Sequence, residues 1–407
     1  MNQSEHILAD QLAELAGKTI PFHMPGHKRV MAPAPDLFCG IDLTEITGAD
    51  NLHHAEGILR EAMDRTAQVF HADRTFYLVN GSTVGNLAAI RAAVSPGQEA
   101  IAAGSCHRSV LNGLELAGAK PHLLIPERVP GWDFPASVQP AQVKKLLEQF
   151  PETAALVLTT PAYEGVISDA ASIAELCHDA GVLLIADEAH GAHLGLFEDS
   201  GFPAGAIAGG ADLVIQSAHK TLPSLTQTAL LHVRGSRVPI ARVEQALAVY
   251  ETSSPSYLLM SSLDGCTGIL RERGRELMTA WKQRLDSFYE AAGRLQCLEV
   301  FHPDTQTMKQ AGIYQMDPSK ILLRARKNSI MGQMLFWALR EEYGIEAEMA
   351  RGCYVLAMTS LCDTDKMMRQ LTDALIDLDQ RICAGEQLEH YAQRPASDVV
   401  CRNFQNH

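Results

Sequence analysis

The sequence has no excess of positive charge. Among its 407 residues, 34 are Lys or Arg and 48 are Asp or Glu, so the formal net charge is −14. Proteins that grip a phosphate backbone need clustered Lys and Arg, and this balance therefore argues against a nucleic-acid-binding protein. The negative charge instead favours a cationic small molecule as the ligand.

The sequence also lacks paired cysteines, a signal peptide and long apolar runs. Its nine cysteines are scattered and form no Cys-x-x-Cys pair, so we expect neither a disulfide framework nor a zinc cluster. The N-terminus has no basic stretch followed by an apolar one. No apolar run approaches the ~20 residues of a membrane-spanning helix. These absences predict a soluble cytoplasmic protein in a reducing compartment, without a membrane partner.

What is present is an alternation of short apolar runs with helical patterns. The runs that predict strands are TFYLV, QEAIAAG, HLLI, ALVLTT, VLLIAD, ADLVIQS and ALLHV, between residues 75 and 233. Short apolar runs separated by helices indicate an α/β fold, with a mainly parallel sheet between two layers of helices. Beyond residue 295, LEVF, KILLRA and CYVLAMTS alternate with helical patterns and predict a smaller α+β domain.

Composition and periodicity suggest four segments along the chain. Residues 1–55 are expected to form an N-terminal arm, which includes a helix near residues 4–16. Residues 56–290 are expected to form the large domain and residues 291–384 the small α+β domain. The remaining residues, 385–407, form a polar tail that we expect to be loosely packed.

Polar clusters follow four of the predicted strands. They are residues 80–83 (NGST), 105–107 (SCH), 187–190 (DEAH) and 217–220 (SAHK). Ligands of doubly wound sheets bind at the carboxyl ends of the strands. The four clusters therefore predict one binding site at that edge.

Each cluster residue also has an ordinary structural explanation. A lone lysine such as Lys220 is usually a solvated charge, but burial would favour the neutral amine that forms Schiff bases. Asp187 suits a helix cap, or a carboxylate facing the ring nitrogen of pyridoxal phosphate. Ser82 and Thr83 suit a turn, or a phosphate at a helix start. A histidine such as His107 is more often packed than functional, although it would also stack on a cofactor ring.

Several motifs of five or more residues together resemble those of a known protein family. They are PFHMPGHK, DLTEITGADNLHHAEG, NGSTVGN, SCHRS, TTPAYEG, ADEAHGAH, QSAHKTLPSLTQTALLH and TSSPSYLLMSSLD, in order between residues 21 and 264, followed by DPSKILL, EEYGIEAEM and YVLAMTS. The sequence resembles the pyridoxal-phosphate-dependent Orn/Lys/Arg decarboxylases of fold type I, the aspartate-aminotransferase fold. It resembles a short form of them without the usual C-terminal extension.

The resemblance implies roles for individual residues. Lys220 matches the lysine that forms the Schiff base with pyridoxal 5'-phosphate, and Asp187 matches the partner of the pyridinium nitrogen. His107 matches the histidine that stacks on the ring, and His190 a residue close to its phenolic oxygen. The positions that match the phosphate pocket are Ser82, Thr83, Ser217 and His219.

The resemblance also implies a reaction and an assembly. The reaction is decarboxylation of lysine, ornithine or arginine to its amine, through an external aldimine and a quinonoid. Ser253 matches a residue that reaches the phosphate of the neighbouring subunit, which implies a homodimer with shared sites, or a higher oligomer. The distal cation of the substrate needs an acidic contact, for which the candidates are Glu164, Glu346 and Glu348.

Other functions remain open at the level of sequence. An aminotransferase or another lyase on the same fold would bind the substrate carboxylate with an arginine, such as Arg324, Arg326 or Arg351. A pyridoxal-phosphate-fold protein that binds without catalysis is also conceivable. Asp187 to His190 spell the DEAH of nucleic-acid ATPases, but Leu12 stands where the P-loop before residues 17–19 needs glycine. Glu188, His190 and His193 would be the ligands of a metal site, with unusual spacing.

Overall fold

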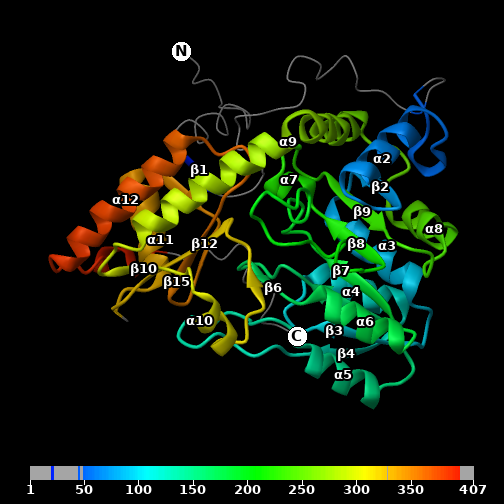
Figure 1. Cartoon of the computed structure of the whole chain (residues 1–407), viewed down its shortest axis with the longest axis horizontal. Coiled ribbons are helices and arrows are strands. Elements are labelled where there is room, and N and C mark those ends of the chain that lie inside the picture. Colours follow the sequence, from blue (N-terminus) through cyan, green and yellow to red (C-terminus); the bar gives the residue numbers. More distant parts are fainter. Residues whose placement is uncertain (1–19, 23–44, 46–48, 328, 395–407) are drawn as a thin grey trace, which may run out of the picture.

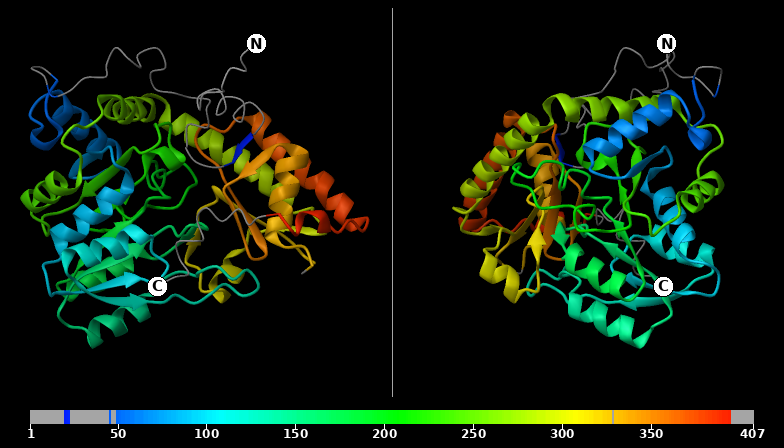
Figure 2. Two further views of the ribbon diagram at one scale, coloured as in Figure 1. Left: turned by 180° about the vertical axis from the view of Figure 1, so that it is seen from behind. Right: turned by 45° about the vertical axis from the view of Figure 1, so that its right-hand side comes forward.

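The computed structural model describes residues 20–22, 45, 49–327 and 329–394, and its two sheets and their helices are shown in Figures 1 and 2. The expected helix near residues 4–16, the tripeptide at 17–19 and the end of the tail beyond residue 394 lie outside the described residues. Of the expected N-terminal arm, the structure describes strand β1 (Ile20–Phe22) and the short helix η2 (Leu52–His54).

The large sheet has seven strands, and the expectation of a mainly parallel α/β fold is confirmed. Strand β9 alone is antiparallel to its two neighbours, β2 and β8. The connection from β8 to β9, residues 217–228, contains a single helical turn and no long crossover helix, so the chain returns in the opposite direction. The strands, in spatial order, are β2 (Arg74–Leu78), β9 (Ala229–Val233), β8 (Leu213–Gln216), β7 (Leu183–Asp187), β5 (Thr153–Thr159), β3 (Glu99–Ala103) and β4 (Lys120–Leu124).

Helices cover both faces of this sheet, and alternate side chains of each strand enter two different cores. One core holds Ile185 and Ile215 against α3 (Gly81–Ala93), α4 (Arg108–Ala117) and α8 (Ile240–Tyr250). The other core holds Leu184 and Val214 with residues of the remaining helices. These helices are α2 (Ile58–Val69), α5 (Pro140–Gln149), α6 (Ala170–Asp179) and α9 (Tyr257–Ala292). Strands buried on both faces explain why their sequences read as continuous apolar runs.

A second, antiparallel sheet lies beside the large one (Figure 1). Its strands, in order, are β10 (Leu298–Val300), β12 (Lys320–Ala325), β15 (Tyr354–Met358) and β14 (Met349–Arg351). The helices of this part are the short α10 (Thr305–Gln310), which precedes β12, α11 (Gly332–Tyr343), which follows β12, and α12 (Asp365–Cys383), which follows β15. Two small strand pairs complete the structure: β6 (Val166–Ile167) with β11 (Gln315–Met316), and β1 with β13 (Ile345–Ala347).

The 36-residue helix α9 connects the two parts and runs across both of them in Figure 1. Its buried residues include Trp281, whose indole N–H donates to Thr359 Oγ1 at 3.1 Å, just beyond β15. Within the described ranges, none of the helices combines the length and the apolar character needed to cross a bilayer.

One expectation about the cysteines is wrong. Cys297, beside β10, and Cys383, at the end of α12, form a disulfide with their Cα atoms 5.7 Å apart. The pair is separated by 86 residues, so only the packing of α12 against the start of β10 brings the two thiols together. The other described cysteines are free: Cys106, Cys177, Cys266, Cys353 and Cys362.

The first part of the tail is packed, in contrast to the expectation of a loose segment. Leu388 and Tyr391 are both buried, and a short helix, η3 (Glu389–Tyr391), carries the second of them. The Tyr391 hydroxyl donates to Glu342 Oε1 at 3.0 Å. The polar composition of the segment hid these two buried side chains, because each is a single large apolar residue in a mostly polar stretch.

Candidate active site

The four polar clusters meet at one cavity of about 260 Å³ between the two sheets. Each cluster follows a strand of the large sheet, and the carboxyl ends of parallel strands lie at the same edge. Met349 and Arg351 of β14 add the small-sheet side of the wall. The predicted site residues that line the cavity are Ser82, His107, Asp187, His190 and Lys220.

Lys220 lies in the single helical turn α7 (Ala218–Thr221) directly after β8. Its Nζ is 2.7 Å from Nε2 of His190, which follows β7. Burial lowers the pKa of Lys220 to about 8; the charge of Lys320 adds to this shift, and Asp187 and Glu348 oppose it. Burial, reinforced by the Lys220 charge, holds the pKa of His190 well below its ordinary value. The imidazole is therefore neutral, and the lysine is close to becoming a neutral amine at physiological pH.

Asp187 is the last residue of β7, and its carboxylate is buried and held from two directions. Asn86 Nδ2 donates to its Oδ2 at 2.9 Å, and the backbone N–H of Ala189 donates to its Oδ1 at 3.2 Å. The structure thus fixes the orientation of this carboxylate at the edge of the cavity.

Two residues that sequence reasoning missed connect Asp187 to His107. The amide of Asn86, in α3, also donates to Ser109 Oγ at 2.9 Å, and Ser109 Oγ lies 2.7 Å from Nδ1 of His107. His107 also caps α4, because its Nδ1 accepts the N–H of Ser109. Asn86 ends the NGSTVGN motif and Ser109 ends the SCHRS motif. Their place in these two motifs was the one sequence feature that could have marked them as site residues.

The expected phosphate residues occupy different environments. Ser217 is fully buried, and its Oγ has no hydrogen-bond partner among the described residues. Ser82 and Thr83 lie in the first turn of α3, where Ser82 is half-buried and Thr83 is exposed. The imidazole of His219 donates from Nδ1 to the Thr228 carbonyl at 2.7 Å. Of these residues, only Ser82 lines the cavity.

Ser253 is separate from this constellation. It is exposed in the loop between α8 and α9 and does not line the cavity of its own chain. The loop contacts η2, because Nε2 of His53 lies 2.9 Å from the carbonyl oxygen of Thr252.

The three acids that are candidates for binding the distal cation of the substrate lie in different environments. Glu164 is buried, lines the cavity and accepts a hydrogen bond of 2.7 Å from the Tyr354 hydroxyl. Glu348 accepts a hydrogen bond from Tyr163, whose ring also packs against that of His190. Glu346 does not line the cavity and pairs instead with Arg340 at 2.9 Å.

The three candidate arginines are separated in the same way. Arg324 pairs with Glu299 at 2.7 Å and stacks on the ring of Trp132 at 4.2 Å. Arg326 is largely exposed and lies 3.7 Å from the same Glu299. Arg351 alone of the three lines the cavity, 4.0 Å from Glu164 Oε1.

The three residues of the rival metal site bind different partners. Glu188 accepts hydrogen bonds of 2.7 Å from the Ala206 N–H and the Gln216 amide, and His193 lies 3.1 Å from Asp317. His190 lies against Lys220. Across the described part of the chain, no group of three or more potential ligands is gathered for a metal ion.

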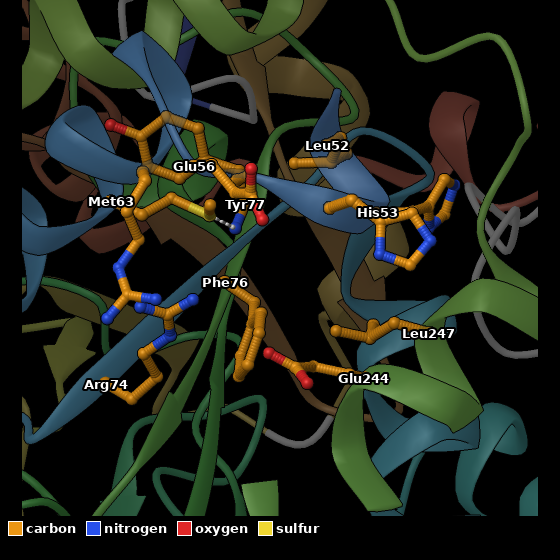
Figure 3. Close-up of a pocket in the computed structure, with 12 residues that line it drawn as sticks. Leu52, His53, Glu56, Met63, Arg74, Phe76, Tyr77, Glu244 and Leu247 are labelled. Atoms are coloured by element: carbon orange, nitrogen blue, oxygen red, sulfur yellow. Dashed lines mark hydrogen bonds between the residues drawn. The ribbon is translucent and has the colours of Figure 1, made fainter. Parts of the chain in front are cut away.

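A second cavity, of about 270 Å³, lies on the outer side of the large sheet at its edge strand β2 (Figure 3). Figure 3 shows Phe76 of β2 beside Glu244 of α8, with Leu52 and His53 of η2 above them. None of the four strand-end clusters contributes to its wall. The candidate active site is therefore the cavity between the sheets.

Comparison with known proteins finds relatives over most of the chain. A family model described as Orn/Lys/Arg decarboxylase, major domain, matches residues 11–358. The arginine decarboxylase of Halalkalibacterium halodurans is 33% identical over 367 residues, which is 88% of this chain and 74% of that protein.

Two solved structures share the fold. The lysine decarboxylase LdcF of Francisella novicida superimposes with a TM-score of 0.73 at 18% identity, over 96% of this chain and 60% of that one. The chain therefore spans less than two thirds of that enzyme. A single-residue variant of SPT, solved with PLP, has a TM-score of 0.62 at 14% identity, over 80% of this chain and 77% of that one.

Proposed function

The chain belongs to the Orn/Lys/Arg decarboxylase family, and we propose that it decarboxylates arginine, lysine or ornithine with pyridoxal 5'-phosphate as its cofactor. The observation that carries this proposal is the convergence of Lys220, Asp187 and His107 on one cavity. An amine, a carboxylate and an imidazole at the carboxyl edge of such a sheet suit this cofactor better than the alternatives raised by the sequence.

The residues present fit each functional group of the cofactor. The Lys220 amine would hold its aldehyde carbon, and the Asp187 carboxylate would face its ring nitrogen. Its phosphate would lie at the start of α3, with Ser82 and Thr83, where free N–H groups and hydroxyls favour an anion. The fully buried hydroxyl of Ser217 supports this assignment, because a buried oxygen without a partner is costly unless a ligand completes it.

When bound, the cofactor would supply an electron sink for the pair of electrons that remains when CO2 leaves. The chain supplies position and charge. Asn86 fixes the orientation of the Asp187 carboxylate, and Ser109 fixes that of the His107 ring. Lys220 Nζ and His190 Nε2, 2.7 Å apart, would hold the proton that is returned to the substrate carbon.

We propose that Glu164 and Glu348 supply the negative charge for the distal cation of the substrate. Glu164 lines the cavity, and Glu348 is hydrogen-bonded to the cavity residue Tyr163. Glu346 pairs with Arg340 and does not line the cavity. A basic side chain placed in the cavity would therefore meet carboxylates at its small-sheet end.

The assembly that we propose is a homodimer with shared sites. Support comes from Ser253, which is exposed and does not line the cavity of its own chain. Its proposed contact with the cofactor phosphate requires the site of a second subunit. Wild-type protein should therefore sediment as a dimer, and Ser253→Ala should weaken cofactor binding without dissociating the dimer.

Arg351 favours one rival, an aminotransferase, because it lines the cavity and would bind an α-carboxylate. Its position near Glu164 weakens that interpretation, since the carboxylate already offsets part of its charge.

An assay separates these activities. Purified protein with pyridoxal 5'-phosphate is incubated with arginine, lysine or ornithine, and CO2 and the amine product are measured. Equimolar CO2 and agmatine, cadaverine or putrescine supports the proposal. A 2-oxo acid without CO2 indicates the aminotransferase, and bound cofactor without turnover indicates a binding protein.

A further inference from the structure

A fully buried ion pair lies directly behind the proposed active site. Lys320, the first residue of β12, and Asp317, just after β11, are both inaccessible to solvent, with Nζ and Oδ2 2.7 Å apart. His193 is equally buried, and its Nε2 lies 3.1 Å from the other carboxylate oxygen. None of these residues lines the cavity.

The protonation states of this cluster follow from its contacts. Burial alone would raise the pKa of Asp317, but Lys320 and His193 outweigh it and lower that pKa. Burial lowers the pKa of His193 despite the neighbouring carboxylate. The cluster is therefore one cation, one anion and a neutral imidazole, with no net charge.

Each proton of the Lys320 ammonium has an acceptor. Two of them bind within the cluster, to Asp317 Oδ2 at 2.7 Å and Ser319 Oγ at 2.9 Å. The third proton leaves the cluster and binds the backbone carbonyl of His190 at 3.1 Å. The Ser319 hydroxyl in turn donates to Asp317 at 2.8 Å, so the pair is internally satisfied.

We propose that the Asp317–Lys320 pair is a positioning device, in which Lys320 holds the His190 carbonyl and so fixes His190 Nε2 against Lys220 Nζ. The same side chain that would share a proton with Lys220 is thus anchored through its own backbone to the small sheet. Lys320 and Asp317 touch neither cofactor nor substrate and act through His190.

The surrounding backbone is shaped to admit Lys320. Gly165 has a φ of +93°, and a Cβ placed there would lie 2.8 Å from both Cβ and Cγ of Lys320. The carbonyl of Gly165 accepts the N–H of Asp317 at 2.8 Å. The pair therefore lies between two loops of the cavity wall, the turn that carries His190 and the loop that carries Tyr163 and Glu164.

A buried ion pair that served only to stabilise the fold would contribute little free energy at this position. Desolvating two charges costs about as much free energy as their attraction returns, and apolar residues of similar size often replace such pairs without loss. What apolar residues cannot supply is the donor to the His190 carbonyl. Lys320 also contributes to the lowered pKa values of Lys220 and His190, alongside burial.

The test is a double-mutant cycle between this pair and the His190 side chain. Lys320→Met with Asp317→Asn removes both charges, so the net charge near Lys220 does not change. With His190 present, kcat should fall by about 10- to 100-fold, with KM changed by less than about threefold. The pH midpoint of the visible band of the bound cofactor should also shift. With His190→Ala, the same two substitutions should change kcat little, whereas the midpoint still shifts because Lys320 also lowers the pKa of Lys220 directly.

The matched control is Asp379→Asn, a buried small-domain carboxylate that accepts the backbone N–H groups of residues 296, 297 and 298. It should lower the thermal midpoint without moving kcat or the spectral midpoint. Equal effects of the pair variant on kcat with and without the His190 side chain would overturn the proposal, as would no effect on kcat in either background.

A second variant covers the case in which the double substitution does not fold. Ser319→Ala removes one contact of Lys320 and one of Asp317 but leaves both charges paired. It should shift kcat and the spectral midpoint in the same direction, less strongly and only when His190 is present. Additive effects would overturn the inference here too.

This inference rests on the proposed function, and the two fail differently. Wild-type protein with neither a cofactor band nor CO2 release refutes the function. An active wild type whose Lys320 and Asp317 variants show no coupling to His190 refutes only the positioning role.

Discussion

Nζ of Lys220 lies 2.7 Å from Nε2 of His190, where the ends of β8 and β7 meet. The depressed pKa of His190, caused chiefly by burial, makes its ring neutral, so Nε2 accepts a proton that Lys220 donates. The His190 ring must then carry its own proton on Nδ1. In the proposed function, Lys220 is the attacking amine and His190 is its proton partner.

The rate at which the apoprotein takes up pyridoxal phosphate should depend on the protonation of Lys220. Burial lowers the pKa of this amine to about 8, and only the neutral form attacks an aldehyde. Uptake should rise about tenfold per pH unit below pH 8 and level off above it. Stopped-flow absorbance measures this rate. Because Glu348 raises the Lys220 pKa, Glu348→Gln should move the midpoint to lower pH. A midpoint near the ordinary lysine value in both proteins would contradict the account.

Asp187→Asn should leave the fold and cofactor uptake intact but lower kcat by about 10²- to 10³-fold. The carboxylate that Asn86 and Ala189 hold in place is the negative charge available to a protonated ring nitrogen. Asn86→Ala, which frees one oxygen of that carboxylate, should cause a smaller loss of the same kind. Steady-state CO2 release measures both. An Asp187→Asn enzyme with wild-type kcat would exclude the proposed role.

Glu164→Gln should raise KM for the basic amino acid by about tenfold, because the cavity loses a carboxylate at its small-sheet end. The amide keeps an acceptor for the Tyr354 hydroxyl, so the fold should be retained. Glu346→Gln is the matched control, since Glu346 pairs with Arg340 outside the cavity and should leave KM unchanged. Equal KM changes in the two variants would refute the assignment.

Glu188→Gln should alter the pH dependence of stability. Burial raises the pKa of Glu188 from 4.5 to about 8, so the folded protein binds a proton here more tightly than the unfolded chain does. This stabilisation of the folded state is fully present below pH 4.5. That contribution is lost as pH rises through 8, and the Gln variant lacks this loss. The difference in unfolding free energy should change by roughly 3–5 kcal/mol between pH 4.5 and 8 in favour of the variant. Urea unfolding at several pH values measures it; parallel pH profiles would contradict the prediction.

Much of the fold could be predicted from sequence because of its apolar runs. VLLIAD, ADLVIQS and ALLHV each became a buried strand, and their polar ends marked the edge where the cavity lies. The reversed direction of β9 was not predicted, because strand direction depends on the length of the connection rather than on the apolar run itself.

The supporting residues could not be found in this way. Asn86 lies on a helix that otherwise reads as core, and only the approach of α3 to β7 brings it to Asp187, 101 residues away. Lys320 opens an apolar run in which a lysine indicates an exposed strand end, whereas the structure buries it completely. The Cys297–Cys383 disulfide likewise depends on tertiary packing.

Covalent trapping tests the central claim most directly. Wild-type protein and Lys220→Ala are each incubated with pyridoxal 5'-phosphate, reduced with borohydride, digested and examined by mass spectrometry. The account predicts a pyridoxyl-phosphate adduct on Lys220 in the wild type, with no adduct at another lysine of either protein. An unmodified Lys220, or equal labelling of both proteins at a different lysine, would contradict it.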